Sequence, residues 1–289
     1  MPNPPISIEQ HGHRTLLKWH RARRKASDPA FSPRRILEGM QLGASVEVDL
    51  VLHADHGFAI LHDPDLHPTT TGTGRVSGAS AQDLRRLFLR GNDGAPTRDR
   101  VMLLDDLCDV LQTASVHPGA VLQLDLKEDR SSLPPAVIAN FARAVSPFAA
   151  AMILSGGDSA AMAALAAATP GLKIGYDPTY PGILDDLTSA EEHTAFIRRA
   201  LRQAPDAGMI YLDYALVLAA EAQGVDMIGI AHADGRRVDA WTIRSVTPTT
   251  LDAVRRLLAL RVDQITLRVD QITTDDPEGL AAAFAEDQT

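Results

Sequence analysis

Residues 45–66 read SVEVDLVLHADHGFAILHDPDL and contain two apolar runs separated by a polar turn. Its first part, residues 46–50, is a short apolar run that predicts a buried strand. Asp55 and Gly57 then predict a turn, and a second extended run covers residues 58–61. The stretch therefore predicts one strand of a parallel sheet, followed by a hairpin that leaves the parallel pattern.

Runs of the same kind recur along the whole chain and alternate with longer stretches rich in Ala and Leu. This alternation indicates β–α–β units with right-handed crossovers. The expected strands are 15–20, 46–50, 121–126, 151–155, 173–177, 209–213, 239–243 and 271–274. The expected helices are 81–89, 103–112, 134–145, 159–168, 191–204, 215–222 and 250–259.

The fold class predicted from these runs is a (β/α)8 TIM barrel with a small hairpin or loop insertion after the second strand. Such a barrel needs about 250 residues, and the chain has 289. No linker rich in Pro or Ser interrupts the pattern, so residues 1–289 are expected to form a single domain. The sequence LRVDQIT occurs twice in succession, at 260–266 and 267–273, and is interpreted as a local duplication in the last connection.

Composition limits the classes of function. Hydrophobic residues make up 45% of the chain and charged residues 22%, as in ordinary globular proteins. A formal net charge of −9 gives no basic field that would attract nucleic acid. The single cysteine, Cys108, excludes an intramolecular disulfide, and no signal peptide or membrane span is expected. We therefore expect a cytoplasmic protein without stable membrane insertion, whose oligomeric state the sequence leaves open.

Charged side chains gather at the ends of two expected strands. Glu47 and Asp49 are two residues apart, so they share one face of their strand, and Asp125 and Lys127 share a face in the same way. If the predicted hairpin forms, His62 returns beside the first pair. Carboxylates suit hard cations such as Mg²⁺ or Ca²⁺, and histidine suits proton transfer near neutral pH. Lys127 could form a simple ion pair or hold a phosphate oxygen.

Several motifs together resemble the glycerophosphodiester phosphodiesterase family. Glu47-Val48-Asp49, then HDPDL at 62–66 and TTTGTGRV at 69–76, resemble the E-x-D, HDP-x-L and TT-x-G-x-G-x-V signature of that family. Asp125-Leu126-Lys127 resembles its E-x-K, WTI at 241–243 its WTV, and VDQITTDDP at 269–277 its VDGIITDRP. These markers occur in family order over most of the chain.

The resemblance implies a barrel enzyme that hydrolyses glycerophosphodiesters to glycerol 3-phosphate and an alcohol. It implies that Glu47, Asp49 and Asp125 hold a divalent cation, although the family has Glu where this chain has Asp125. His62 would act with a second histidine as a general acid and base. Trp241 is interpreted either as barrel packing or as an apolar wall of the substrate pocket.

The second histidine is less well defined because the HRG motif of the family is missing. His20 with Arg21 and Ala22 is the favoured candidate, since it closes a plausible first strand at the usual distance from Glu47. His13 with Arg14 is the alternative and would make residues 6–12 the first strand. Arg21 and Lys127 are the candidate phosphate ligands. The basic run of Arg21, Arg23, Arg24 and Lys25 is interpreted as a solvated loop or as a clamp for an anionic substrate.

Two other functions stay open from the sequence. A phospholipase-D-like or sugar-phosphodiester hydrolase could use the same barrel, because the loop after the first strand departs from the family pattern. A catalytically inactive binding barrel is the second alternative, because HRG is absent. Ser155 ends a strand without a G-x-S-x-G motif around it, so we interpret it as structural and not as a nucleophile.

Overall fold

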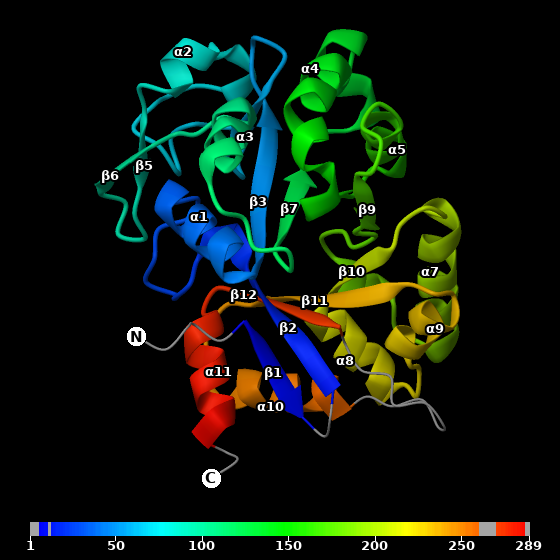
Figure 1. Cartoon of the computed structure of the whole chain (residues 1–289). Helices are drawn as coiled ribbons and strands as arrows, with labels where there is room; N and C mark the ends of the chain where they lie inside the picture. Colours follow the sequence, from blue (N-terminus) through cyan, green and yellow to red (C-terminus); the bar gives the residue numbers. More distant parts are fainter. Residues whose placement is uncertain (1–5, 11–12, 260–269, 287–289) are drawn as a thin grey trace. The chain divides into compact units, whose positions relative to one another are not determined.

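The computed structural model describes residues 6–10, 13–259 and 270–286 (Figure 1). The chain forms two compact units, one of Trp19–Lys173 and one that joins Met1–Lys18 to Ile174–Thr289. Each unit is described by itself below. The single-domain organisation of residues 1–289 stays a prediction, and the LRVDQIT duplication lies largely outside the described residues.

The unit Trp19–Lys173 contains the strands in the order β4-β3-β7-β8. The parallel members are β3 (Ser45–Leu52), β7 (Val121–Leu126) and β8 (Met152–Gly156), while β4 (Phe58–Ile60) is antiparallel to β3. Their apolar residues are buried almost completely, as expected of strands covered by helices. The register sets Asp49 beside Asp125, and Asp125 beside Ser155. Long-range pairing therefore brings the predicted site residues to neighbouring positions.

The insertion predicted after the second strand is present and is larger than expected. It continues from β4 through the short helix α2 (Ala81–Leu84) into a separate hairpin of β5 (Phe88–Arg90) and β6 (Pro96–Arg100). The predicted helix 81–89 is wrong beyond Leu84. There the backbone N–H of Arg90 donates to the Thr69 carbonyl, so pairing with a distant segment replaces the helical turns.

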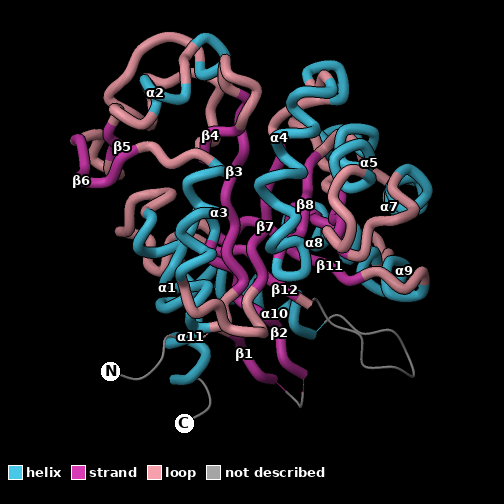
Figure 2. Tube along the Cα trace, turned by 45° about the horizontal axis from the view of Figure 1, so that its top comes forward, coloured by secondary structure: helices cyan, strands magenta, loops and turns pink. Residues whose placement is uncertain are grey.

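Helices follow the parallel strands of this unit, and α5 packs against β8 (Figure 2). They are α1 (Pro33–Leu42), α3 (Leu104–Thr113), α4 (Pro135–Val145) and α5 (Ser159–Ala167). Only α1 was not predicted, although Pro33 at its first turn and Gly43 at its end are ordinary helix signals. Gly43 has φ 83°, a left-handed conformation that glycine adopts without steric cost.

The other unit contains strands in the order β1-β2-β12-β11-β10-β9. They are β1 (Ser7–Gln10), β2 (His13–Trp19), β9 (Lys173–Tyr176), β10 (Met209–Asp213), β11 (Arg237–Ile243) and β12 (Gln271–Thr274). Neighbours from β9 to β12 pair in parallel, whereas β1 is antiparallel to β2. The helices are α6 (Ile183–Asp186), α7 (Ala190–Gln203), α8 (Tyr214–Ala222), α9 (Met227–Ala233), α10 (Pro248–Ala259) and α11 (Pro277–Glu286).

A buried polar cluster joins four strands of this unit. Lys18 Nζ lies 3.0 Å from Asp239 Oδ2, and both side chains are at most 2% exposed. The other oxygen of Asp239 accepts a 2.6 Å hydrogen bond from the Thr273 hydroxyl. Lys18 Nζ also lies 4.4 Å from the ring centroid of Tyr211. Pairing of this kind offsets the cost of burying the two charges.

The eight parallel strands among the described residues match the predicted ones to within about two residues at each end. Their alternation with helices is that of a (β/α)8 barrel, so the predicted fold class is confirmed. Among the described helices, none alone is long and apolar enough to cross a membrane. Helices α8 and α9 taken together have the length and composition of a membrane span, but the chain bends by 102° between them.

Candidate functional site

Three carboxylates form the centre of the candidate site in the unit Trp19–Lys173. Glu47 and Asp49 project from β3, and Asp125 projects from β7 in direct register with Asp49. One oxygen of each carboxylate lies within 4.8 Å of the others. Glu47 and Asp49 are 4% and 1% exposed. Asp125 reaches the cluster although it is one methylene shorter than the glutamate expected there, so the substitution leaves the group of three intact.

Lys127 joins two of these carboxylates. Its Nζ lies 2.7 Å from Asp49 Oδ1 and 2.5 Å from Asp125 Oδ2. Both contacts are charge-assisted and offset part of the repulsion within the cluster. Of the two interpretations of Lys127, the ion pair is thus observed, and a role as phosphate ligand stays a prediction.

The far oxygen of Asp125 is held by a buried hydrogen-bond chain that the sequence did not reveal. The Ser155 hydroxyl donates to Asp125 Oδ1 over 2.6 Å and accepts from the Gln123 amide over 2.8 Å. Ser155 is fully buried and Gln123 is 4% exposed. The two-residue period of β7 puts Gln123 on the same face as Asp125, which was the available signal. The Ser155 hydroxyl thus contacts a candidate metal ligand, and its interpretation as a structural residue stays a prediction.

Burial dominates the electrostatics of the cluster. Desolvation, together with the charges of Asp49 and Asp125, raises the pKa of Glu47 well above its ordinary value. Burial alone would lower the pKa of Lys127, but the carboxylates of Asp125 and Asp49 outweigh it and raise that pKa. Asp49 Oδ2 is buried and accepts no hydrogen bond from the described residues. Burial and the neighbouring carboxylates thus both oppose the charged form of Glu47.

The chain after β2 lies against the same carboxylates. His20 directly follows Trp19, the last residue of β2, and begins a short 3-10 turn that ends at Ala22. Within that turn, the Arg21 backbone N–H donates to Glu47 Oε2 over 2.6 Å, and Arg21 Nε lies 3.5 Å from Asp49 Oδ2. The structure therefore brings Arg21 to the site and sets the half-buried His20 one residue before it.

The backbone of this turn is strained. Arg21 has φ 51° and Ala22 has φ 59°, a left-handed conformation that costs a non-glycine residue roughly 1–3 kcal/mol. In this conformation the Arg21 N–H points at Glu47 Oε2. The rest of the basic run points elsewhere: Arg24 pairs with Glu38 over 2.6 Å, and Arg23 donates to Asn92 over 3.2 Å. Arg21 is thus the member of this run with established contacts to Glu47 and Asp49.

The alternative histidine occupies the opposite end of the strand. His13 begins β2, and its Cα partner is Gln10 of the antiparallel strand β1. Strand β1 is thus not a parallel barrel strand, and His13 lies six positions before Trp19. His20 is therefore the candidate placed at the C-terminal end of the first parallel strand, where barrel active sites are built. Its catalytic role stays a prediction.

His62 follows the hairpin predicted from the sequence. Strand β4 runs back along β3 with Ile60 opposite Leu50, so the chain beyond Ile60 heads toward the level of Glu47 and Asp49. The His62 side chain is 35% exposed, and its Nδ1 lies 2.9 Å from Asp63 Oδ1. That contact fixes the ring orientation and leaves Nε2 as the nitrogen available for proton transfer. Among the described residues, no hydrogen bond links His62 to the three carboxylates, and its role stays a prediction.

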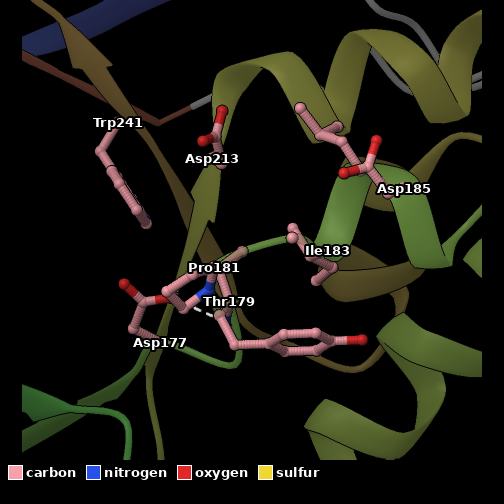
Figure 3. A pocket seen from close by; sticks show the side chains of 10 residues that line it. Asp177, Thr179, Pro181, Ile183, Asp185, Asp213 and Trp241 are labelled. Atoms are coloured by element: carbon pink, nitrogen blue, oxygen red, sulfur yellow. Dashed lines mark hydrogen bonds between the residues drawn. The ribbon is translucent and has the colours of Figure 1, made fainter.

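Trp241 lines a cavity of about 430 Å³ in the unit that contains Ile174–Thr289. Figure 3 shows the Trp241 ring on one side of this cavity and Thr179, Pro181 and Ile183 on the other. Asp177 follows β9 and Asp213 ends β10, and both carboxylates face the space beside the ring (Figure 3). Trp241 therefore lines a cavity, and its role as a wall of the substrate pocket stays a prediction. The sequence did not predict the participation of Asp177 or Asp213.

Comparisons with known proteins agree with this geometry. The model of the glycerophosphoryl diester phosphodiesterase family matches residues 37–278. No curated protein matches the chain.

Several solved structures have a similar fold. A glycerophosphodiester phosphodiesterase from Galdieria sulphuraria shares 19% identity with a TM-score of 0.70, covering 94% of this chain and 98% of that one. A glycerophosphoryl diester phosphodiesterase from Parabacteroides distasonis shares 19% identity with a TM-score of 0.66, covering 97% and 90%. An Oleispira antarctica phosphodiesterase, in complex with the product sn-glycerol-3-phosphate, shares 18% identity with a TM-score of 0.65, covering 93% and 96%.

Proposed function

The chain belongs to the glycerophosphoryl diester phosphodiesterase family and is a phosphoric diester hydrolase, and from this premise we propose that it hydrolyses glycerophosphodiesters to glycerol 3-phosphate and an alcohol with a bound divalent cation. The observation that carries the proposal is the convergence of three carboxylates within 4.8 Å on adjacent strands. The complex of the Oleispira antarctica phosphodiesterase with sn-glycerol-3-phosphate supports the same product for this chain.

The residues present fit a hard divalent cation. Glu47, Asp49 and Asp125 would hold it, and carboxylate oxygens are the ligands that Mg²⁺ and Ca²⁺ prefer. The buried Asp49 Oδ2 lies 3.5 Å from Arg21 Nε but accepts no hydrogen bond from the described residues, so it can serve as a ligand atom. When bound, the cation would supply Lewis-acid stabilisation of charge on the phosphate oxygens. We propose Mg²⁺ or Ca²⁺ on the grounds of this all-oxygen ligand set.

The chain's own side chains would orient the phosphate and move protons. Arg21 and Lys127 already face Asp49, and their positive charges would hold an anionic phosphate beside the carboxylates. His20 and His62 would exchange protons with the attacking and leaving oxygens, one as base and the other as acid. Asp63 would keep His62 in a single ring orientation through its 2.9 Å contact with Nδ1.

The first experiment tests the metal. Hydrolysis of glycerophosphodiesters should stop in excess chelator and return on addition of Mg²⁺ or Ca²⁺, because the clustered carboxylates need a cation. The Glu47→Gln variant should lose cation affinity and turnover together. Full activity in excess chelator would contradict the metal proposal but would leave the family assignment intact.

The second experiment tests the two histidines. His62→Ala should fold normally and lose about 10²–10⁴-fold in kcat, the usual contribution of a general acid or base. His20→Ala should lose a similar factor, whereas His13→Ala, the matched control at the other end of β2, should lose little. A loss below about tenfold for His62→Ala would remove that residue from the mechanism. If His13→Ala lost far more turnover than His20→Ala, the catalytic histidine of the first strand would be His13 and not His20.

A further inference from the structure

The turn that presents Arg21 to the carboxylates is closed by a buried residue farther along the chain. The backbone N–H of Phe31 donates to the Arg21 carbonyl over 2.8 Å, and Phe31 is 1% exposed. Phe31 also has a positive φ of 59°. Residues 21–31 therefore form a loop whose two ends meet at Arg21, and the contacts that hold this loop also set the direction of Arg21.

The strained turn at Arg21 and Ala22 depends on contacts from outside it. Glycine adopts a positive φ without steric cost, but both of these residues carry a side chain. Backbone strain of this kind persists only where the surrounding structure over-determines the conformation. The charged residues of the loop 21–31 and of helix α1 provide such contacts.

An ion-pair network of four side chains joins this loop to helix α1. Glu38 Oε1 accepts from Arg24 Nη1 over 2.6 Å, and Glu38 Oε2 accepts from Arg35 Nη1 over 2.6 Å. Arg35 Nη2 donates in turn to Asp28 Oδ1 over 2.9 Å. Arg24 and Asp28 belong to the loop, whereas Arg35 and Glu38 belong to α1. The network therefore fixes the loop to the helix through charge-assisted hydrogen bonds.

Asp28 also organises the backbone of the loop. Its Oδ2 accepts the N–H of Arg24 over 3.2 Å and the N–H of Lys25 over 3.1 Å. The insertion holds the same loop from another side, because the Asn92 amide, between β5 and β6, donates to the Ala26 carbonyl over 2.9 Å. The loop is thus fixed to two elements that the chain reaches after it, α1 and the hairpin of β5 and β6.

Partial burial strengthens the ion-pair network. Its four side chains are between 13% and 24% exposed. Burial alone would raise the pKa of Glu38, but hydrogen bonds from Arg35 and Arg24 outweigh it and lower that pKa. Burial alone would likewise lower the pKa of Arg35, but hydrogen bonds to Glu38 and Asp28 outweigh it and raise that pKa. Isolated surface pairs contribute little, whereas several charges joined in one network hold their elements together.

We propose that this ion-pair network positions Arg21, so that the Arg21 backbone N–H faces Glu47 and its side chain faces Asp49. Its four members are positioning residues, because they act on the site through Arg21. The geometric part of the proposal concerns contacts within the unit Trp19–Lys173 alone. The consequence for phosphate binding rests on the proposed function, in which Arg21 is a phosphate ligand.

Hydrogen exchange of the Arg21 amide, followed by NMR, tests the geometry. In Glu38→Gln, which keeps a good helix former in α1, this amide should exchange about tenfold faster, while amides of the core strand β7 keep their rates. Asp28→Asn is the second variant and should give the same result. The control Asp105→Asn breaks an exposed ion pair with Arg143 in the same unit and should change the Arg21 rate less than twofold. An unchanged Arg21 rate in both network variants, or an equal acceleration in β7, would overturn the proposal.

A double-mutant cycle tests whether the network acts through Arg21. Calorimetry measures the Kd for glycerol 3-phosphate with Mg²⁺ present. Glu38→Gln should raise this Kd about tenfold in the wild-type background but less than twofold in the Arg21→Ala background. An equal increase in both backgrounds would show that the network does not act through Arg21 and would overturn the proposal. If the wild type binds no glycerol 3-phosphate, the proposed function fails, while exchange of the Arg21 amide still decides the positioning role.

Discussion

Replacing Ser155 by alanine removes one oxygen atom and tests how the candidate metal ligand Asp125 is held. The Ser155 hydroxyl donates to Asp125 Oδ1 over 2.6 Å and accepts from the Gln123 amide over 2.8 Å. Because Ser155 is fully buried, water cannot replace the lost hydroxyl without rearrangement. Alanine fits the space, so the change is confined to these two hydrogen bonds.

The expected magnitude follows from the charge on Asp125. A hydrogen bond to a charged group contributes about 1.5–3 kcal/mol, and a similar loss is expected in the free energy of unfolding of the metal-free protein. Groups that orient metal ligands contribute about 10–100-fold to metal affinity. We therefore expect Ser155→Ala to raise the Kd for Mg²⁺ or Ca²⁺ by that factor, because the Asp125 carboxylate loses the hydrogen bond that holds its Oδ1 in place.

Calorimetric titration of chelator-stripped protein measures the affinity, and urea unfolding measures the stability. Ser131→Ala is the matched control, since Ser131 also donates to an aspartate, Asp129, over 2.5 Å, but at an exposed position. The control should change neither quantity appreciably. A folded Ser155→Ala variant whose metal Kd stays within about twofold of the wild type would refute the positioning role. Failure of the wild type itself to bind metal would instead refute the metal proposal.

Three further predictions concern charge and burial. Folding raises the pKa of Glu47, so the charged form of Glu47 destabilises the metal-free folded state. In thermal melts, the metal-free wild type should be as stable as Glu47→Gln in acid, and it should become less stable than that variant as the pH rises from about 4 through the folded pKa. Parallel stability profiles of the two proteins across pH would contradict this expectation. Asp239→Ala removes the carboxylate that pairs with the buried Lys18, so the free energy of unfolding in urea should fall by about 3–5 kcal/mol. The control variant Glu221→Gln breaks the exposed ion pair with Arg256, and its free energy of unfolding should fall by at most about 1 kcal/mol. Burial raises the pKa of Cys108 to about 12, so its thiol should resist a disulfide reagent until the protein unfolds; rapid reaction in the native state would show that the site opens.

Local sequence determined the strands and most of the helices of this protein. The strands 121–126, 209–213 and 271–274 were predicted with the bounds that the structure has, because short apolar runs bounded by turn residues carry their own signal. The hairpin between β3 and β4 follows from Asp55 and Gly57 in the same way. The two-residue period also put Glu47 with Asp49, and Asp125 with Lys127, on shared faces.

Tertiary structure alone decided which atoms meet. The hydrogen bond between Ser155 and Asp125 joins residues 30 apart, and the ion pair of Lys18 with Asp239 joins strands at opposite ends of the sequence. Such contacts depend on strand register, which no local pattern encodes. Helix α2 ends at Leu84 for the same reason, since pairing of the following chain outweighs its helical tendency. Sequence thus determines which residues carry charge and on which face they lie, whereas the register of distant strands determines which charges are paired and which are left to bind a ligand.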